Sequence, residues 1–137
     1  MTGKNDETKQ LIELGYSDKA IELYQNDVNF GVMDDPDANA VFLGSHGDLI
    51  RLYIKLRGDI VEEAKFLCYG CPGSIAAMSA LTLTIKGLSL SDAKNLAVDD
   101  VLKALGGLPE EKQECAEIAV KTLQKAIAEY EKPKTNH

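Results

Sequence analysis

The feature that most constrains the fold is a change of hydrophobic period in the middle of the chain. From Leu49 to Arg57, apolar residues alternate with polar or amphipathic ones, which is the pattern of a strand with one buried face. Gly58-Asp59 predicts a turn, and the segment 60–68 predicts a second strand of a β-hairpin. From Ser74 onward the apolar spacing is helical. The sequence therefore predicts an α+β fold, a small antiparallel sheet packed against a layer of helices.

The helical half of the chain begins with its most apolar segment. The helix predicted from Ser74 to Gly87 is apolar nearly all round, so we expect it at the centre of the core. Three further helices are predicted over residues 89–96, 99–105 and 115–130.

The residues before the hairpin are less regular. Ser17 predicts the N-cap of a helix that extends to Tyr24, and residues 25–39 are rich in loop-forming residues. Residues 40–43 predict a third antiparallel strand. The expected sheet is therefore three-stranded.

The chain of 137 residues is expected to form a single domain over 1–137. We interpret 1–15 as an N-terminal extension that is frayed up to Lys9, and 131–137 as a flexible tail. A chain of this length buries about two thirds of the surface that its unfolded form exposes. It needs neither a disulfide nor a metal merely to fold, so a metal site in it would be functional.

The composition excludes several classes of partner. The formal net charge is -7, which leaves no basic excess for nucleic acid or an anionic membrane and favours basic partners. The number of cysteines is odd, and the sequence shows no secretory segment, so we expect reduced thiols and no disulfide framework. No apolar run approaches the length that crosses a bilayer, about 18–20 residues. We therefore expect a cytoplasmic location.

Residues able to bind metal stand at three junctions between the predicted elements. His46 and Asp48 lie in a glycine-containing loop between two strands, Cys71 lies ahead of the buried helix, and Cys115 lies at the start of the last helix. Helix starts favour the thiolate form of cysteine, because unpaired backbone N–H groups and the helix dipole stabilise negative charge. If the junctions converge, these residues with Cys68 form a ligand set suited to zinc or an iron–sulfur cluster.

Each of these residues also has a plain structural explanation. Cys68 falls on the apolar face of its strand, and Cys115 heads the apolar stripe of its helix, so both can be core thiols. His46 can be a solvated loop residue, and Asp48 can cap a turn. The Cys68–Cys71 pair lacks the second Cys-x-x-Cys that zinc sites usually show. The residue pattern alone gives a candidate metal site and leaves these alternatives open.

Taken together, these segments resemble the NifU/IscU-type iron–sulfur cluster assembly scaffolds, over residues 16–130 and in the same order. The step of 44 residues from Cys71 to Cys115 suits the IscU-like branch and leaves no room for the insertion of the zinc-associated SufU branch. The segments similar to the family's are Tyr16–Tyr24, Gly47-Asp48, Lys65-Phe66 with Tyr69-Gly-Cys71, and Ala104–Pro109 with Lys112 and Cys115.

The resemblance implies an assembly scaffold and not an enzyme. Such a scaffold accepts sulfur from a cysteine desulfurase, builds a transient [2Fe-2S] cluster, and passes it to apo iron–sulfur proteins, often with an Hsp70-type chaperone pair. It implies that Cys71 and Cys115 are thiolate ligands and sulfur acceptors. It also implies that Asp48 is the carboxylate that keeps the cluster labile, because a hard oxygen donor binds it less firmly.

The segment that the resemblance assigns to chaperone recognition is partly altered. Leu108, Pro109 and Lys112 match it, whereas Glu110 and Glu111 replace a proline and a valine. The resemblance implies chaperone use, but two positions of the segment differ from the family's.

Three further departures lie at the site itself. His46 stands where the family has its first cysteine, Glu114 stands where it has a histidine, and Cys68 is an additional thiol. Cys68 or His46 can complete an altered cluster site, with Glu114 as another alternative ligand, and a histidine ligand tends to raise the cluster's potential. Alternatively the standard site is lost, and the protein is a zinc-binding or cluster-free interaction module of the same machinery.

Overall fold

The computed structural model describes residues 3–44 and 47–132, so His46 and most of the predicted tail lie outside the described residues. The N-terminal half contains the helices α1 (Gly3–Glu13) and α2 (Asp18–Gln25) and the strands β1 (Ala38–Leu43), β2 (Leu49–Arg57) and β3 (Ile60–Tyr69). The C-terminal half contains α3 (Pro72–Ile85), α4 (Leu90–Lys94), α5 (Val98–Leu105), the 3-10 helix η1 (Glu110–Lys112) and α6 (Glu114–Glu131).

The three strands form one antiparallel sheet in the order β1-β2-β3. This arrangement confirms the predicted hairpin and the predicted third strand. The register places Leu49 opposite Leu43 on one side and opposite Tyr69 on the other. The β1–β2 loop and the exit of β3 therefore meet at the same end of the sheet.

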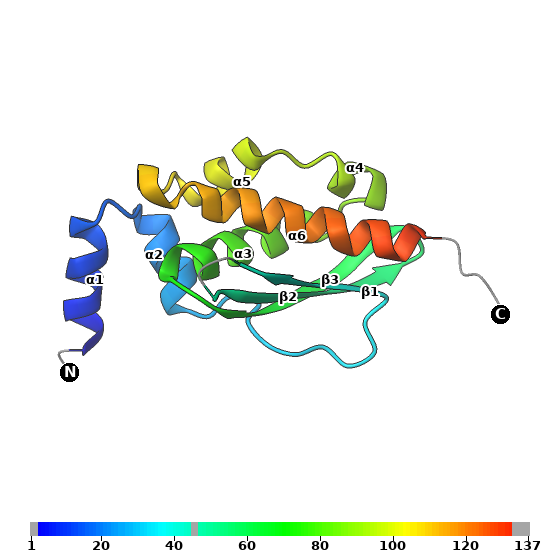
Figure 1. Ribbon diagram of the computed structural model, residues 1–137, viewed down its shortest axis with the longest axis horizontal. Coiled ribbons are helices and arrows are strands. Elements are labelled where there is room, and N and C mark those ends of the chain that lie inside the picture. Colours follow the sequence, from blue (N-terminus) through cyan, green and yellow to red (C-terminus); the bar gives the residue numbers. More distant parts are fainter. Residues whose placement is uncertain (1–2, 45–46, 133–137) are drawn as a thin grey trace.

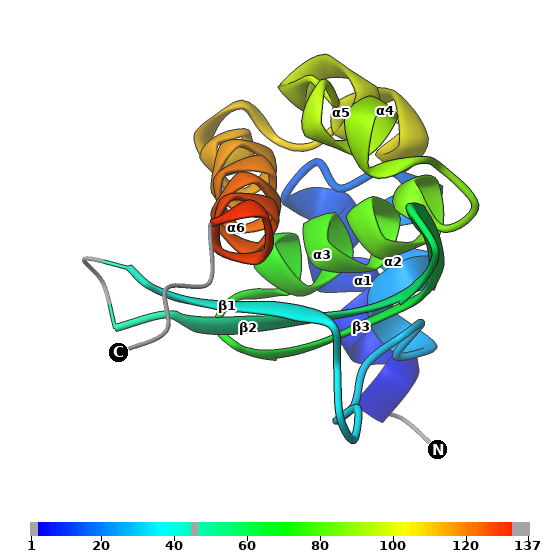
Figure 2. The ribbon, with the colours of Figure 1, turned by 90° about the vertical axis from the view of Figure 1, so that its right-hand side faces the viewer.

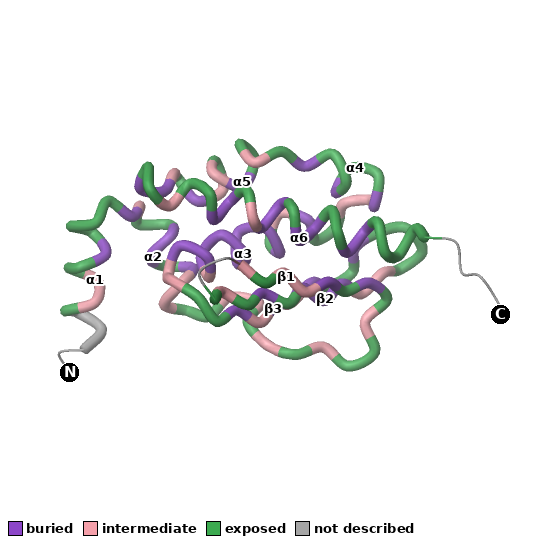
Figure 3. Tube along the Cα trace, in the orientation of Figure 1, coloured by how far each residue is buried: buried purple, intermediate pink, exposed green. Residues whose placement is uncertain are grey.

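Helices cover one face of the sheet in two layers. Figures 1 and 2 show α3 and α6 directly on the sheet, with α6 over β1 and α3 over β3, and α4 and α5 on their far side. The helix α3 is buried over most of its length, as expected, although Leu83 is 45% exposed. Buried residues accordingly lie between the sheet and these helices in Figure 3. Within the described residues, no helix is both long and apolar enough to cross a membrane.

The other face of the sheet is crossed by the loop that follows α2. Gly31 N–H donates to the Phe66 carbonyl of β3 over 2.8 Å, and Asp37 N–H donates to the Ile54 carbonyl of β2 over 2.9 Å. The loop thus runs beneath the sheet (Figure 2). Tyr53 is 6% exposed, although the alternation of β2 places it on the polar face.

The N-terminal helix differs from expectation. The sequence predicted a frayed segment up to Lys9, whereas α1 begins at Gly3. Two side-chain hydrogen bonds hold it against α2: Tyr24 Oη donates to Glu7 Oε2 over 2.9 Å, and Gln25 Nε2 donates to Thr8 Oγ1 over 2.6 Å. These tertiary contacts, with the buried side chain of Leu11, supply the stabilisation that its polar sequence lacks.

Candidate metal centre

The three junctions that carry the predicted ligands converge on one pocket. Its volume is about 200 Å³, and it lies where the β1–β2 loop, the start of α3 and the start of α6 meet. The residues that line it are Gly44, Asp48, Cys71, Glu111, Lys112, Glu114, Cys115 and Ile118. The structure therefore brings Asp48, Glu114 and two of the three cysteines to a common site.

Cys71 and Cys115 form the centre of this site. Cys71 is the N-cap of α3, with Pro72 favouring the first helical turn, and Cys115 lies in the first turn of α6. Their sulfur atoms are 3.9 Å apart. Two thiolates on one tetrahedral zinc or iron atom stand about 3.8 Å apart, given metal–sulfur bonds of about 2.3 Å. The pair is thus preorganised at ligand spacing.

The pKa values of the two thiols shift in opposite directions. The hydrogen bond from Cys115 lowers the pKa of Cys71, and a hydrogen bond from Ser74 and the positive charge of Lys112 act in the same direction, whereas burial opposes them. The pKa of Cys115 is raised, first by its hydrogen bond to Cys71 and then by burial. The opposite directions favour the half-buried Cys71 over the buried Cys115 as the thiol of the pair that ionises more readily.

Gly73 allows the close packing around the pair. A β-carbon at Gly73 would lie 3.2 Å from Cys115 Sγ and 3.2 Å from the hydroxyl of Tyr16, so glycine is the residue that fits there. Burial, followed by the charges of Cys71 and Cys115, raises the pKa of Tyr16 to about 12. The backbone N–H of Gly73 acts to lower the pKa of Tyr16.

Sequence reasoning missed Tyr16, Gly73 and Ser74 as members of the site. One signal was available for Ser74, because it follows Cys71 by three residues and so stands on the same face of the first helical turn. Tyr16 precedes the confirmed N-cap Ser17, whose hydroxyl accepts from Ala20 N–H over 3.0 Å. Its approach to α3 is a tertiary contact that no local pattern indicates.

The side chains of Asp48 and Cys68 both lie close to Gly70. A β-carbon at Gly70 would be 3.4 Å from Asp48 Oδ1 and 3.5 Å from Cys68 Sγ. Asp48 is partly exposed and lines the pocket, whereas Cys68 is 4% exposed and does not. Burial, followed by the charges of Asp48 and Cys71, raises the pKa of Cys68 to about 12. This environment agrees with the interpretation of Cys68 as a neutral core thiol.

The remaining predicted residues lie around the rim or outside the described part of the chain. Glu114 is exposed at the edge of the pocket, and Lys112 is partly exposed there. Leu108 and Pro109 are buried, and the ring of Pro109 packs against the Gly15 turn. His46 is not described. Within 3–44 and 47–132, no three histidine, cysteine or acidic residues form a ready cation site.

Comparisons with known proteins agree with the resemblance in the sequence. The family model described as NifU-like N terminal domain matches residues 15–137, so α1 precedes the matched region. The iron–sulfur cluster assembly scaffold protein IscU 1 of Archaeoglobus fulgidus is 38% identical over 116 residues, covering 84% of this chain and 76% of that protein. IscU of Azotobacter vinelandii, also named a scaffold protein, is 36% identical over 126 residues, covering 88% of this chain and 98% of that protein.

The fold itself has been seen in solved structures. A NifU-like protein (N-terminal) from Brucella abortus superposes with a TM-score of 0.69 at 17% identity, covering 88% of this chain and 97% of that chain. At this identity the likeness shows the fold alone. It confirms the predicted three-stranded α+β architecture.

Proposed function

The chain belongs to the family of NifU-like N-terminal domains, and on this premise we propose that it is a scaffold for the assembly and transfer of an iron–sulfur cluster, and not an enzyme. The observation that carries the proposal is the pair of cysteine sulfurs 3.9 Å apart in an open pocket. Soft thiolates are the ligands that iron–sulfur clusters prefer. A [2Fe-2S] cluster fits this donor set.

In the proposed ligand set, Cys71 and Cys115 supply the thiolates and Asp48 the oxygen donor. Cys68 is buried as a neutral thiol and does not line the pocket. We therefore assign the fourth ligand position to His46, two residues before Asp48. Glu114, at the rim, is the alternative. A carboxylate and an imidazole hold iron less firmly than thiolates, which suits a cluster that must be passed on.

Sulfur acceptance is proposed to begin at Cys71. The Cys71 thiolate attacks the outer sulfur of a persulfide on a cysteine desulfurase, the sulfur–sulfur bond of the enzyme breaks, and the enzyme leaves with a thiolate. Cys71 then holds the persulfide, and Cys115 follows as the second acceptor. The partial exposure of Cys71 and its lowered pKa support this order, because the thiolate is the nucleophile.

Apo iron–sulfur proteins are the proposed recipients of the cluster, and the cytoplasm is the proposed location. Recognition by an Hsp70-type chaperone pair at Leu108, Pro109 and Lys112 would require local opening, because the first two are buried. The zinc-binding or cluster-free module is the weaker alternative, since the IscU relatives are named as iron–sulfur cluster assembly scaffolds.

Anaerobic reconstitution tests the proposal. Protein incubated with ferrous iron, cysteine, a cysteine desulfurase and a thiol reductant, which reduces persulfide sulfur to sulfide, should gain visible absorption with equal iron and sulfide. It should then convert an apo-ferredoxin to its holo form. Cys71→Ser and Cys115→Ser should lose the chromophore, whereas Cys68→Ser should keep it. A wild-type protein that stays colourless and holds one zinc would contradict the proposal.

A further inference from the structure

Ser74 is a buried hydroxyl whose hydrogen-bond partners are both sulfur atoms. It lies in the first turn of α3 and is 2% exposed. Its Oγ donates to Cys115 Sγ over 3.5 Å and lies 3.6 Å from Cys71 Sγ. These distances fall within the range of hydrogen bonds to sulfur, so the hydroxyl touches both members of the pair.

The other buried serine and threonine hydroxyls of the described residues are used differently. Ser79 donates to the Val28 carbonyl over 3.0 Å, Thr82 to the Ser79 carbonyl over 2.9 Å, and Thr122 to the Ile118 carbonyl over 2.8 Å. Each of these satisfies its own donor with a backbone oxygen. Burying a hydroxyl costs free energy unless it has such a partner, and Ser74 finds its partner in the cysteine pair.

We propose that Ser74 is the positioning residue of the cysteine pair, holding Cys71 and Cys115 at ligand spacing and donating a hydrogen bond to a bound thiolate. The proposal rests on the proposed function only in assuming that the two thiols bind a metal together. Outer hydrogen-bond partners fix the direction of metal ligands and withdraw charge from them. Because the Ser74 hydroxyl lies within hydrogen-bond distance of both sulfurs, it can donate to the thiolate of Cys71 or to that of Cys115.

Cobalt(II) is the probe that tests this role, because its thiolate complexes absorb in the near-ultraviolet and visible and their formation requires neither sulfide nor a desulfurase. Ser74→Ala should weaken anaerobic Co²⁺ binding by about tenfold or more, the loss typical of removing an outer hydrogen-bond partner. It should also shift the sulfur-to-cobalt band, since the thiolate loses a hydrogen bond. In cluster-loaded protein, the same variant should show a more negative reduction potential.

Ser79→Ala is the matched control, because it removes a buried hydroxyl from the same helix and leaves the sulfurs untouched. It should lower the melting temperature without moving the cobalt band. If Ser74→Ala does not fold, the near-isosteric pair Ser74→Thr and Ser74→Val gives the comparison. The threonine variant should keep the wild-type position of the cobalt band, and the valine variant should show the shifted band and weaker Co²⁺ binding expected of Ser74→Ala.

The outcomes separate the two proposals. A wild-type cobalt band that Ser74→Ala leaves unchanged in position and affinity would overturn the role of Ser74 and leave the scaffold function standing. An equal shift in Ser79→Ala would also overturn it, because the effect would then be general to α3. A wild-type protein without any thiolate–cobalt band would overturn both.

Discussion

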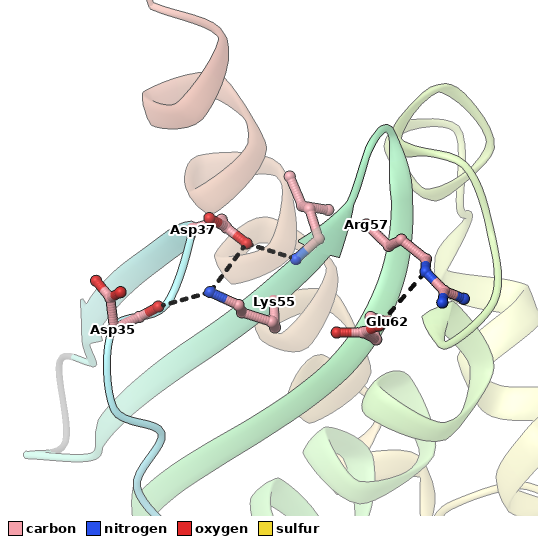
Figure 4. Close-up of polar contacts among 6 residues, drawn as sticks. Asp35, Asp37, Lys55, Arg57 and Glu62 are labelled. Carbon is pink, nitrogen blue, oxygen red and sulfur yellow. Dashed lines mark hydrogen bonds and ion pairs between the residues drawn. The ribbon is translucent and has the colours of Figure 1, made fainter.

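Polar side chains gather at both ends of the sheet, and the two ends are built from different chemistry. At the end away from the cysteines, Lys55 Nζ lies 3.7 Å from Asp37 Oδ2 and donates to the Asp35 carbonyl over 3.3 Å, and Arg57 Nε lies 3.8 Å from Glu62 Oε2 (Figure 4). The Arg57 side chain is 83% exposed. At the cysteine end the interacting atoms are sulfurs and hydroxyls, mostly buried.

The two ends of the sheet should respond differently to substitution, because the polar groups are exposed at one end and mostly buried at the other. Exposed ion pairs are screened by water and contribute about 0–1 kcal/mol each. Buried groups at the other end have no water to replace a lost partner, so each substitution there should cost more. We therefore expect substitutions to affect metal binding at the cysteine end and to have little effect at the other.

The largest effect is expected for Cys115→Ser. Serine oxygen is a poor ligand for a soft site. Loss of an outer hydrogen-bond partner lowers metal affinity by about 10–100-fold, and loss of a ligand should lower it further. The iron content after reconstitution should fall accordingly. Iron and sulfide per chain measure the loss. Retention of half the wild-type content would contradict the assignment of Cys115 as a ligand.

Gly73→Ala should come next. The new methyl group would meet Cys115 Sγ and the Tyr16 hydroxyl at 3.2 Å each, so both must move. Overpacking of this kind costs about 1–3 kcal/mol, which urea denaturation can measure. Adding Tyr16→Phe removes one of the two contacts and should recover part of the loss. If the double variant shows simple additivity, the proposed clash at the Tyr16 hydroxyl is wrong.

The alkaline limit of stability should depend on Cys68. In the unfolded chain a thiol loses its proton near 9.0, whereas burial raises the pKa of Cys68 to about 12 in the folded protein. Between these values the unfolded state binds fewer protons, so stability should fall as pH rises. Melting temperatures from pH 8 to 11 should decline less steeply in Cys68→Ala than in the wild type, and equal slopes would refute the burial of a neutral thiol.

The smallest effect is expected for Arg57→Ala. Because the Arg57–Glu62 pair is exposed, its loss should change the free energy of unfolding by less than about 1 kcal/mol. Cobalt affinity should remain that of the wild type. A clear change in metal binding would show that the two ends of the sheet are coupled, contrary to the comparison above.

The sheet and the central helix could be predicted because their signals are local. The alternation from Leu49 to Arg57 and the apolar run after Ser74 each report burial directly. The alternation placed Tyr53 on the polar face, yet it is 6% exposed, because burial on that face depends on tertiary packing that no local pattern reports. The part of helix α1 up to Lys9 was missed for a similar reason, since its contacts with α2 stabilise a polar segment.

The sequence singled out Cys71 and Cys115 because cysteines at helix starts have a recognisable chemistry, and the structure places their sulfur atoms 3.9 Å apart. Their role as ligands stays a prediction. The residues packed around the pair could not be predicted from the sequence. The support of the pair consists of contacts between segments far apart in the sequence. Gly73 and Ser74 of α3 meet Cys115 of α6, and Gly73 also meets Tyr16, which precedes α2. Only the folded chain brings these segments together. The role of His46 stays a prediction.

The central claim is that the two cysteines of this chain hold an iron–sulfur cluster. Protein purified without air, then assayed for iron, acid-labile sulfide and zinc together with its visible spectrum, tests it most directly. We expect iron and sulfide in equal amounts and a chromophore that Cys71→Ser abolishes. Zinc without sulfide in a colourless protein would contradict it.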